Sequence, residues 1–258
     1  MINSLIKKTG TLGYFSQAKA LITKSRNSVP DTKVVVFSQG RSGSHVLMQL
    51  LGGHPDAYTD GSLIGHRVVA PFRYIDFRSQ CSGKNIYGFK VKPFHIQRQN
   101  ISMTDFFAHL INKNWKVIHL ERSNKCRQCI SNLYAEKIKT GHVSKSNKME
   151  RPKINVDVDK IIRGIGKREE RAKNETRVMK EIPHLKLNYE EDLLPQEKHS
   201  NTVNRVFQWL GVAESSAKIG IEPSTPKRTK DFIANFDELA SALQSNGYAH
   251  FLERSNSK

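Results

Sequence analysis

The sequence predicts an α/β domain in which helices cover both faces of a parallel sheet. The length of 258 residues suits one large domain. Short apolar runs alternate with segments of helical periodicity from about residue 33 to residue 210, which is the pattern of a parallel sheet with crossover helices. A loop rich in glycine and serine follows the first apolar run, where such folds commonly bind ligands.

Four apolar runs are predicted strands. The first, residues 33–37, is rich in valine and predicts a buried strand. The others cover residues 85–91, 115–120 and 184–188. Ligands of parallel sheets bind beyond the carboxyl ends of the strands, so the loops that follow these four runs are the places to search for a site.

Apolar residues at helical spacing predict the helices between and after these strands. They cover residues 43–51, ended by Gly52 and Gly53; 104–110, capped by Thr104; 124–139; 158–179; 203–210, ended by Gly211; and 233–243. Residues 140–155 are polar and basic and predict a loop. We expect one domain over residues 31–258, preceded by a basic arm or helix over residues 1–30.

The formal net charge of +18 indicates an anionic partner. Nucleic acid is not the expected one, because the basic residues are spread out and few aromatic residues accompany them to stack bases. An anionic cofactor, an acidic glycan and a membrane surface remain open. No apolar run approaches the roughly 20 residues of a membrane span, and no secretory signal is evident. Three cysteines are no disulfide framework, so we expect a cytoplasmic protein.

The loop after the first strand has the composition of an anion site. Its glycines leave room for a ligand, the helix that follows offers free N–H groups, and the other side chains add donors and a cation. The site residues are Gln39, Gly40, Arg41, Ser42, Gly43, Ser44 and His45. The sheet is therefore expected to be P-loop-NTPase-like. A nucleoside triphosphatase is not expected, because no lysine follows Gly43 and the glycine spacing differs.

A second anion site is predicted after the third strand. Arg122 follows that strand and Ser131 lies nine residues later, two turns into the predicted helix. Both face the sheet edge that carries the first loop. Two anion sites on one edge indicate a ligand with two separated phosphates.

Both loops resemble the signatures of a known family. "FSQGRSGSH" and "HLERSNKCRQCISNLY" are similar to the two motifs of sulfotransferases that use PAPS, 3′-phosphoadenosine 5′-phosphosulfate. Residues 187–193 and the tail "NFDELASALQSNGYAHFLE" resemble the carbohydrate-directed bacterial branch, which includes rhizobial nodulation-factor and mycobacterial trehalose sulfotransferases. The resemblance implies PAPS as cofactor, PAP as product, no metal, and a carbohydrate or glycolipid acceptor, with possible membrane contact through a basic face.

The resemblance also implies roles for single residues. The first loop would hold the 5′ end of PAPS, and Arg122 and Ser131 would hold its 3′-phosphate. Lys227 and Arg228 are similar to a late basic loop that closes over the donor, and Lys90 is the expected catalytic cation. That branch has a glutamate base where Ser62 stands here, so the base is open among His66, Asp60 and His95. The alternative function is a non-catalytic basic protein that binds acidic polysaccharide or nucleic acid.

Overall fold

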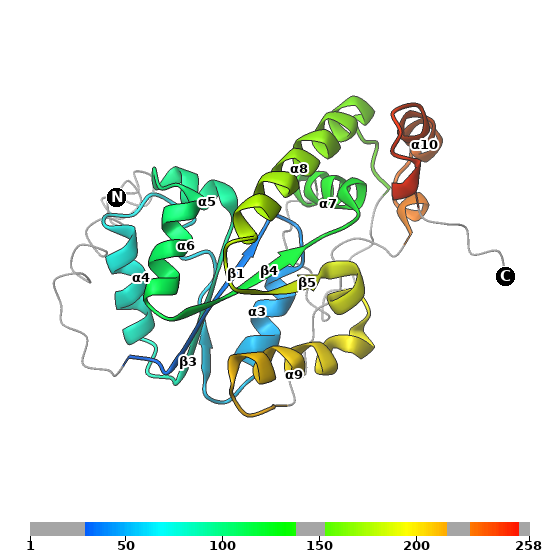
Figure 1. The fold of residues 1–258 in the computed structure, drawn as a ribbon. Helices are drawn as coiled ribbons and strands as arrows, with labels where there is room; N and C mark the ends of the chain where they lie inside the picture. Colours follow the sequence, from blue (N-terminus) through cyan, green and yellow to red (C-terminus); the bar gives the residue numbers. More distant parts are fainter. Residues whose placement is uncertain (1–28, 138–152, 216–227, 253–258) are drawn as a thin grey trace, which may run out of the picture.

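The computed structural model describes residues 29–137, 153–215 and 228–252, and its centre is a parallel sheet (Figure 1). The strand order in the sheet is β2-β3-β1-β4-β5. The strands are β1 Thr32–Ser38, β2 Ala57–Thr59, β3 Ile86–Val91, β4 Trp115–Glu121 and β5 His184–Asn188. The predicted α/β class with a parallel sheet is confirmed.

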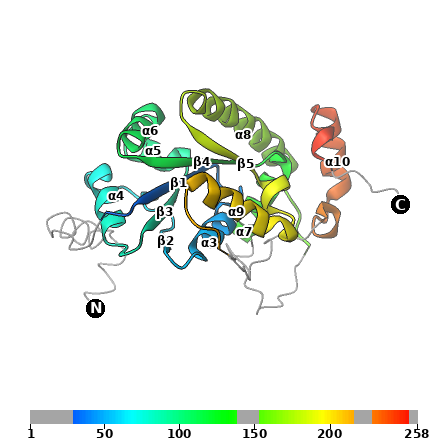
Figure 2. The same cartoon turned by 60° about the horizontal axis from the view of Figure 1, so that its bottom comes forward.

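Helices lie on both faces of the sheet (Figure 2). On one face, α3 and α9 cover a cluster built on Val34, Val36 and Ile118. On the other face lie α4, α5, α6 and the C-terminal end of α8. The helices are α3 Ser44–Gly52, α4 Pro71–Gln80, α5 Pro93–Arg98, α6 Met103–Asn112, α7 Lys125–Lys137, α8 Val158–Met179, α9 His199–Leu210 and α10 Phe236–Ser245, with short turns at Tyr189–Leu193, Gln196–Lys198, Thr229–Asp231 and Ala249–Phe251.

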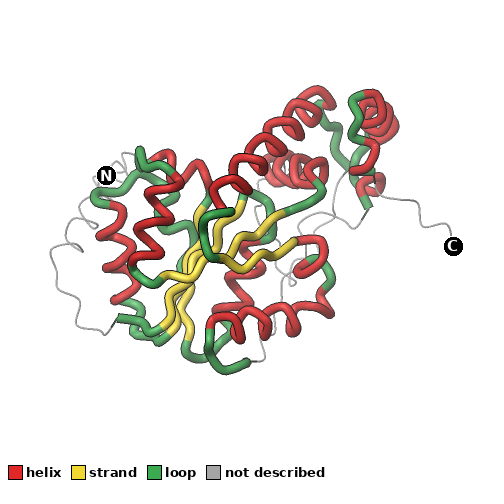
Figure 3. The backbone as a smooth tube through the Cα atoms, viewed as in Figure 1, coloured by secondary structure: helices red, strands yellow, loops and turns green. Residues whose placement is uncertain are grey.

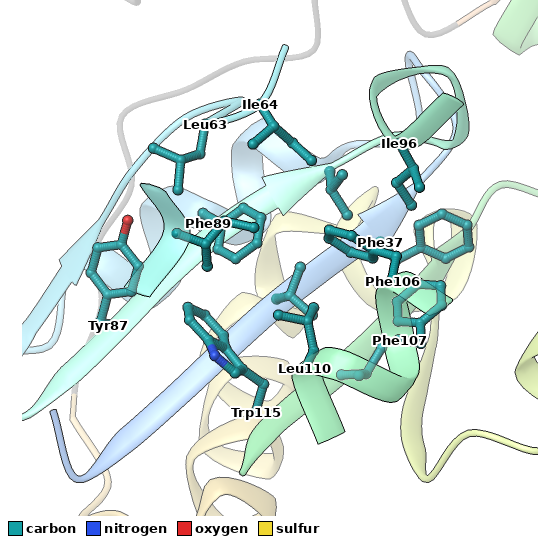
Figure 4. Packing of buried hydrophobic residues seen from close by; sticks show 14 of the residues in the cluster. Phe37, Leu63, Ile64, Tyr87, Phe89, Ile96, Phe106, Phe107, Leu110 and Trp115 are labelled. Carbon is teal, nitrogen blue, oxygen red and sulfur yellow. The ribbon is translucent and has the colours of Figure 1, made fainter. Parts of the chain in front are cut away.

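Alternation along the strands explains the two faces. Phe37 of β1 and Phe89 of β3 point into the second cluster, where Phe107 of α6 meets Phe37 edge-to-face with ring centroids 5.0 Å apart (Figure 4). Their strand neighbours point to the first cluster. Because the central strands are buried on both sides, they read as continuous apolar runs in the sequence.

A third cluster lies beside the sheet, where α7, α8 and α10 pack together (Figure 3). Ile130 of α7, Ile161 of α8 and Leu239 of α10 are fully buried there. This packing fixes α7 and the first half of α8 relative to each other, which matters for the site described below.

Three predicted helix starts are wrong, and one of them is that of α9, which begins at His199 rather than at residue 203. Ser102, not Thr104, is the N-cap of α6, because the Ser102 hydroxyl accepts a hydrogen bond of 3.0 Å from the N–H of Asp105. The last helix begins at Phe236 rather than residue 233, because Ile233 pairs with Ile154 in an isolated parallel bridge.

The sequence did not predict β2, α4 or α5. Strand β2 has three residues, too few for a recognisable alternation. Helix α5 has six residues and opens at Pro93, and α4 carries only two buried residues, Ile75 and Ser79. None of the described helices is both long enough and apolar enough to span a membrane. The expected arm over residues 1–30 lies almost wholly outside the described residues.

Candidate anion-binding site

The loop from Gln39 to Gly43 lies at the carboxyl edge of the sheet, between β1 and α3. Strand β4 lies beside β1, so that Ser38 pairs with Leu120 and the two loops that follow are neighbours. The connection from β1 leaves through α3 on one face, whereas the connection from β4 returns through α8 on the other. Such a divergence opens a crevice at the strand ends, where ligands of α/β sheets bind.

The loop turns through two residues in the left-handed region, Arg41 with φ 66° and Gly43 with φ 84°. Gly43 is the N-cap of α3 and supplies no side-chain cap to the first turn. The N–H groups of that turn therefore remain directed at the crevice, as in helix-terminal anion sites. The ring of Tyr189 packs against Gly43, so that a Cβ at this position would lie 2.3 Å from the ring carbon Cδ2.

Gly43→Ala is expected to destabilise the fold by roughly 2–4 kcal/mol, the sum of the left-handed backbone and the collision with Tyr189. Gly211→Ala is the matched control, because Gly211 has φ 73° but an added Cβ there meets no atom within 4 Å. Urea unfolding of both variants measures the difference. Equal losses in the two variants would show that Tyr189 does not restrict the loop.

Buried side chains of α7 and α8 hold the loop in place. Gln128, which is fully buried, donates 2.9 Å hydrogen bonds to the carbonyl of Gly40 and the hydroxyl of Ser42. Arg168 donates to the same carbonyl at 3.2 Å. The Gln39 amide donates to Glu175 Oε2 at 3.3 Å. The loop is thus fixed from outside, leaving its N–H groups for a ligand.

Arg41 connects the two predicted anion sites. Its Nε donates to the Ser131 hydroxyl at 3.0 Å, and its carbonyl accepts from Nη1 of Arg122 at 2.8 Å. The structure therefore brings Arg122 and Ser131 together with the first loop, as the sequence suggested. It places the Arg41 guanidinium at Ser131, on the side predicted for the 3′-phosphate rather than the 5′ end.

Arg122 is 7% exposed, and its charge is only partly balanced by one nearby carboxylate, that of Glu190. Its guanidinium stacks 4.6 Å from the centre of the Tyr189 ring, and its Nε lies 3.4 Å from Glu190 Oε1 without a hydrogen bond. Glu190 itself accepts from the N–H groups of Ser123 and Asn124, at 2.8 and 3.1 Å. Burial lowers the pKa of Arg122, although Tyr189 and Glu190 oppose that shift. A further anion would relieve this strain on the charged form.

Two lysines stand at the end of β3, Lys90 within the strand and Lys92 directly after it, as the N-cap of α5. The Nζ atom of Lys92 lies 4.0 Å from the place of a Cβ at Gly40, and among the described residues, apart from the chain neighbours of Gly40, no other atom comes within that distance. Burial lowers the pKa of Lys92, and the charge of Arg41 lowers it further. Burial also lowers the pKa of Lys90, and there the charge of Lys92 adds to the effect. Lys92, which the sequence did not single out, is thus the lysine beside the loop.

The three candidate bases lie in different settings. Asp60 is bound in a network, because Arg78 Nη2 donates to it at 2.8 Å and the Tyr87 hydroxyl at 2.6 Å. His95 is buried, accepts the N–H of Lys92 on Nδ1, and has a pKa lowered to about 4 by burial and by Lys92, Arg98 and Lys90. His66 is exposed. The structure therefore leaves His66 as the most accessible of the three.

Asp60→Asn is expected to lower the free energy of unfolding by about 1–3 kcal/mol, because Arg78 and the buried Tyr87 hydroxyl lose a charged acceptor. The affinity for PAP should stay unchanged. Chemical unfolding and calorimetric titration test the two statements. A variant with wild-type stability and lost turnover would instead support the base role predicted from the sequence.

The late basic loop is described only in part. Lys227 lies outside the described residues, and Arg228 is exposed. The next residue, Thr229, is buried and accepts a 3.2 Å hydrogen bond from Nη1 of Arg127 on α7. Arg228 therefore precedes a residue that contacts α7, the helix that carries Ser131, and it stays a candidate for donor binding.

Other residues of the site were missed by sequence reasoning. Gln128 and Ser131 stand three apart on α7, a spacing that places both on one helix face and could have pointed to Gln128. Arg168 and Glu175 lie in a predicted helix crowded with charges, so nothing in the sequence distinguished them. Tyr189 and Glu190 belong to residues 187–193, which resemble the carbohydrate-directed branch, but the sequence assigned no role to either residue.

Among residues 29–137, 153–215 and 228–252, no group of three or more histidine, cysteine, aspartate or glutamate side chains is arranged to hold a metal ion. Cys126 and Cys129 are buried free thiols, and Cys81 is an exposed one. Burial raises the pKa of Cys129, against the opposing effect of Arg168.

No protein-family model matches the chain, and no curated protein matches it. Several solved structures show a weak likeness, among them three sulfotransferase structures. The mouse sulfotransferase SULT7A1 complexed with PAP is 11% identical with a TM-score of 0.43, over 93% of this chain and 81% of that one. The sulfotransferase domain from the curacin biosynthetic pathway is 12% identical with a TM-score of 0.42, over 78% and 80%.

The third structure is the sulfotransferase domain from the Synechococcus PCC 7002 olefin synthase. It is 15% identical with a TM-score of 0.41, over 86% of this chain and 90% of that one. At these identities and scores the likeness decides nothing about the site. The function is therefore inferred from the residues and contacts of this chain.

Proposed function

We propose that this protein transfers a sulfuryl group from PAPS to a hydroxyl group of a carbohydrate-containing acceptor. The single observation that carries the proposal is the junction of Arg41, Arg122 and Ser131 with the loop after β1. The junction joins two anion-binding elements at one edge of the sheet. A donor with phosphates at both its 3′ and 5′ ends needs this arrangement.

The residues present fit such a donor. Arg122 Nε is buried without a hydrogen bond, and the Ser131 hydroxyl, which accepts from Arg41, retains a proton to donate. Gly40 leaves open space beside Lys92. Arg122, Ser131 and Arg41 would therefore hold the 3′-phosphate. The loop from Gln39 to His45, with Lys92, would hold the 5′ end, and Lys227 and Arg228 would add cations.

When bound, PAPS would supply an activated sulfuryl group. Lys92 would stabilise negative charge on the oxygens at the 5′ end, and Lys90, two residues earlier in β3, would support it. We propose that the reaction needs no metal, because these cations and the loop N–H groups supply the stabilisation. His66 is the proposed base for the acceptor proton, because Asp60 and His95 are engaged in the contacts described above.

The acceptor is proposed to be an oligosaccharide or glycolipid, because the two loops and residues 187–193 resemble the carbohydrate-directed branch. For a glycolipid, the basic surface would meet a membrane, and the expected compartment is the cytoplasm. The alternative is a non-catalytic protein that binds acidic polysaccharide or nucleic acid. That alternative does not explain why two proposed anion sites lie together at one edge of the sheet.

A thermal-shift panel with PAP, ATP–Mg and heparin tests the proposal. At 100 times its dissociation constant, PAP should stabilise the fold by about 2.7 kcal/mol, which raises Tm by roughly 5–10 °C. ATP–Mg should have little effect. Stabilisation by heparin alone would favour the alternative, and stabilisation by ATP–Mg alone would indicate a nucleotide kinase.

The affinity for PAP is expected to fall as pH rises from neutral to alkaline. The pKa values of Lys90 and Lys92 are lowered in the free protein, and an anion binds only their protonated forms, so deprotonation competes with binding. Lys92→Arg should flatten the decline, because the guanidinium stays charged. Calorimetric titration at constant ionic strength measures both profiles. An affinity that rises with pH would contradict the placement of these lysines.

A further inference from the structure

A basic cavity of about 260 Å³ lies between α7 and α8. Five cationic residues of α8 line it, and no acidic residue does. Figure 1 shows the two helices side by side, on the side of the sheet that carries the strand ends. The cationic residues are Lys160, Arg163, Lys167, Arg168 and Arg171.

The spacing of these residues gathers them on one helix face. Positions 160, 167 and 171 of an α-helix point in nearly the same direction, and positions 163 and 168 lie at the two edges of that face. The carboxylates of Asp159, Glu169 and Glu170 do not line the cavity. Among the described residues, no carboxylate forms an ion pair with Lys160, Arg163, Lys167 or Arg171.

Like charges crowded on one face repel each other, which costs stability unless an anion is bound. The third hydrophobic cluster holds the helices together beneath the cavity, with Ile130 and Ile161 fully buried. The fold thus keeps the cations in place without carboxylate partners. This is the arrangement expected of a site for an anionic ligand.

The cavity adjoins the proposed donor site. Arg168 lines the cavity and also donates to the carbonyl of Gly40 in the loop. Asn132, another lining residue, follows Ser131 directly in the chain. A molecule in the cavity would therefore lie beside the loop without occupying the place of Arg122 and Ser131.

The remaining lining favours a saccharide over a nucleic acid. Asn132 offers an amide, whose nitrogen donates to Glu136 Oε1 at 2.7 Å, and the partly buried Leu133 offers a small apolar surface. No aromatic side chain lines the cavity, whereas single-stranded nucleic acids are commonly held by aromatic stacking. Hydroxyl groups with an acidic substituent match an amide, aliphatic carbons and several cations.

We propose that this cavity binds the acidic group of the saccharide acceptor, which therefore already carries a carboxylate, sulfate or phosphate before transfer. That the bound saccharide is the acceptor rests on the proposed function, but binding of the saccharide to the cavity is measured separately. It narrows the substrate class from carbohydrates in general to acidic ones.

The test uses the full chain and calorimetric titration at physiological salt. Trigalacturonate is the carboxylated probe, a heparin-derived tetrasaccharide the sulfated one, and maltotriose the neutral control. The variant Lys167→Ala/Arg171→Ala removes two cations from the cavity. Lys173→Ala/Arg177→Ala removes two exposed cations from the other side of the same helix. Alanine favours helix in all four positions, so both proteins should fold.

We expect the cavity variant to weaken binding of at least one acidic probe by about tenfold, and the control variant by about twofold or less. Maltotriose should not bind. Binding of PAP should be unchanged in both variants. If the wild-type protein does not bind PAP, the proposed function fails whatever the saccharides do.

Three results would overturn the cavity site itself. The first is equal weakening of the acidic probes in both variants, which would mark a general charge effect. The second is a failure of selectivity: maltotriose binds as tightly as the acidic probes, or the protein binds no saccharide at all. The third is an oligothymidylate that binds more tightly than the saccharides and is lost in the cavity variant alone, which would assign the surface to nucleic acid.

Discussion

Arg122→Ala should reduce the affinity for PAP by at least about 30-fold, because removal of a buried charge that contacts an anion typically costs 2–5 kcal/mol. The guanidinium is 7% exposed, so water cannot replace it at the 3′-phosphate. The Arg41 carbonyl also loses the donor that ties the loop to β4. Calorimetric titration with PAP gives the change directly.

Arg205→Ala is the matched control for that loss. Arg205 also pairs with a carboxylate, Asp192, at 2.8 Å, but its side chain is half exposed and it contacts no residue of the loop. The control should bind PAP as the wild type does. Arg122→Lys should recover part of the affinity, since charge returns but the forked geometry does not. An Arg122→Ala protein that folds and binds PAP within about threefold of wild type would remove Arg122 from the site.

Lys92→Ala should lower turnover by about 10²–10³-fold, the usual cost of one missing donor at developing charge. Its Nζ lies 4.0 Å from the place of a Cβ at Gly40, in the loop proposed to hold the 5′ end. Affinity for PAP should fall far less, because the 3′ half of the site is intact. Release of PAP from PAPS, with water or a saccharide as acceptor, supplies the rate.

Lys90→Ala is the matched variant, at a lysine two residues earlier, within β3. The structure predicts a smaller loss for it than for Lys92→Ala. The sequence alone favours Lys90, so the ranking of the two rates separates the two assignments. Full turnover in the Lys92→Ala protein would exclude Lys92 from the chemistry.

The alternation of buried strands with helices could be predicted from the sequence, because β1, β3 and β4 are covered on both faces and therefore consist largely of apolar residues. Helix α8 also matched its predicted bounds, residues 158–179, despite two glycines. Ser102 was missed as a cap because a serine and a threonine stood two apart, and only the hydrogen bond to Asp105 distinguishes them. Short elements such as β2 carry too few residues for a period to show.

The meeting of the two loops was predictable for a related reason, and their role in donor binding stays a prediction. Loops that follow strands at one edge must meet, so Arg122 and Ser131 could be assigned to the loop without coordinates. Which side chains contact one another where the two loops meet could not be predicted from the sequence. Which of Lys90 and Lys92 approaches Gly40, and that Arg41 turns to Ser131, depend on strand register and on a left-handed backbone at Arg41.

The basic cavity escaped prediction because its lining comes from two helices, α7 and α8, whose packing the sequence does not show. Arg163, Lys167 and Arg171 look like the solvated face of any basic helix until α7 closes the cavity beside them. Asp60 was a candidate base because it stands in the stretch where the resembling branch has its glutamate, and only the contacts with Arg78 and Tyr87 show its structural use.

The central claim is a site for a nucleotide with two separated anionic groups, and the comparison of PAP with adenosine 5′-phosphate tests it most directly. The two ligands differ only in the 3′-phosphate that Arg41, Arg122 and Ser131 are proposed to hold. Competition calorimetry should show PAP binding at least about 100-fold more tightly, as two or more charge-assisted hydrogen bonds imply. Equal affinities for the two nucleotides, or tighter binding of ATP–Mg than of PAP, would contradict the account.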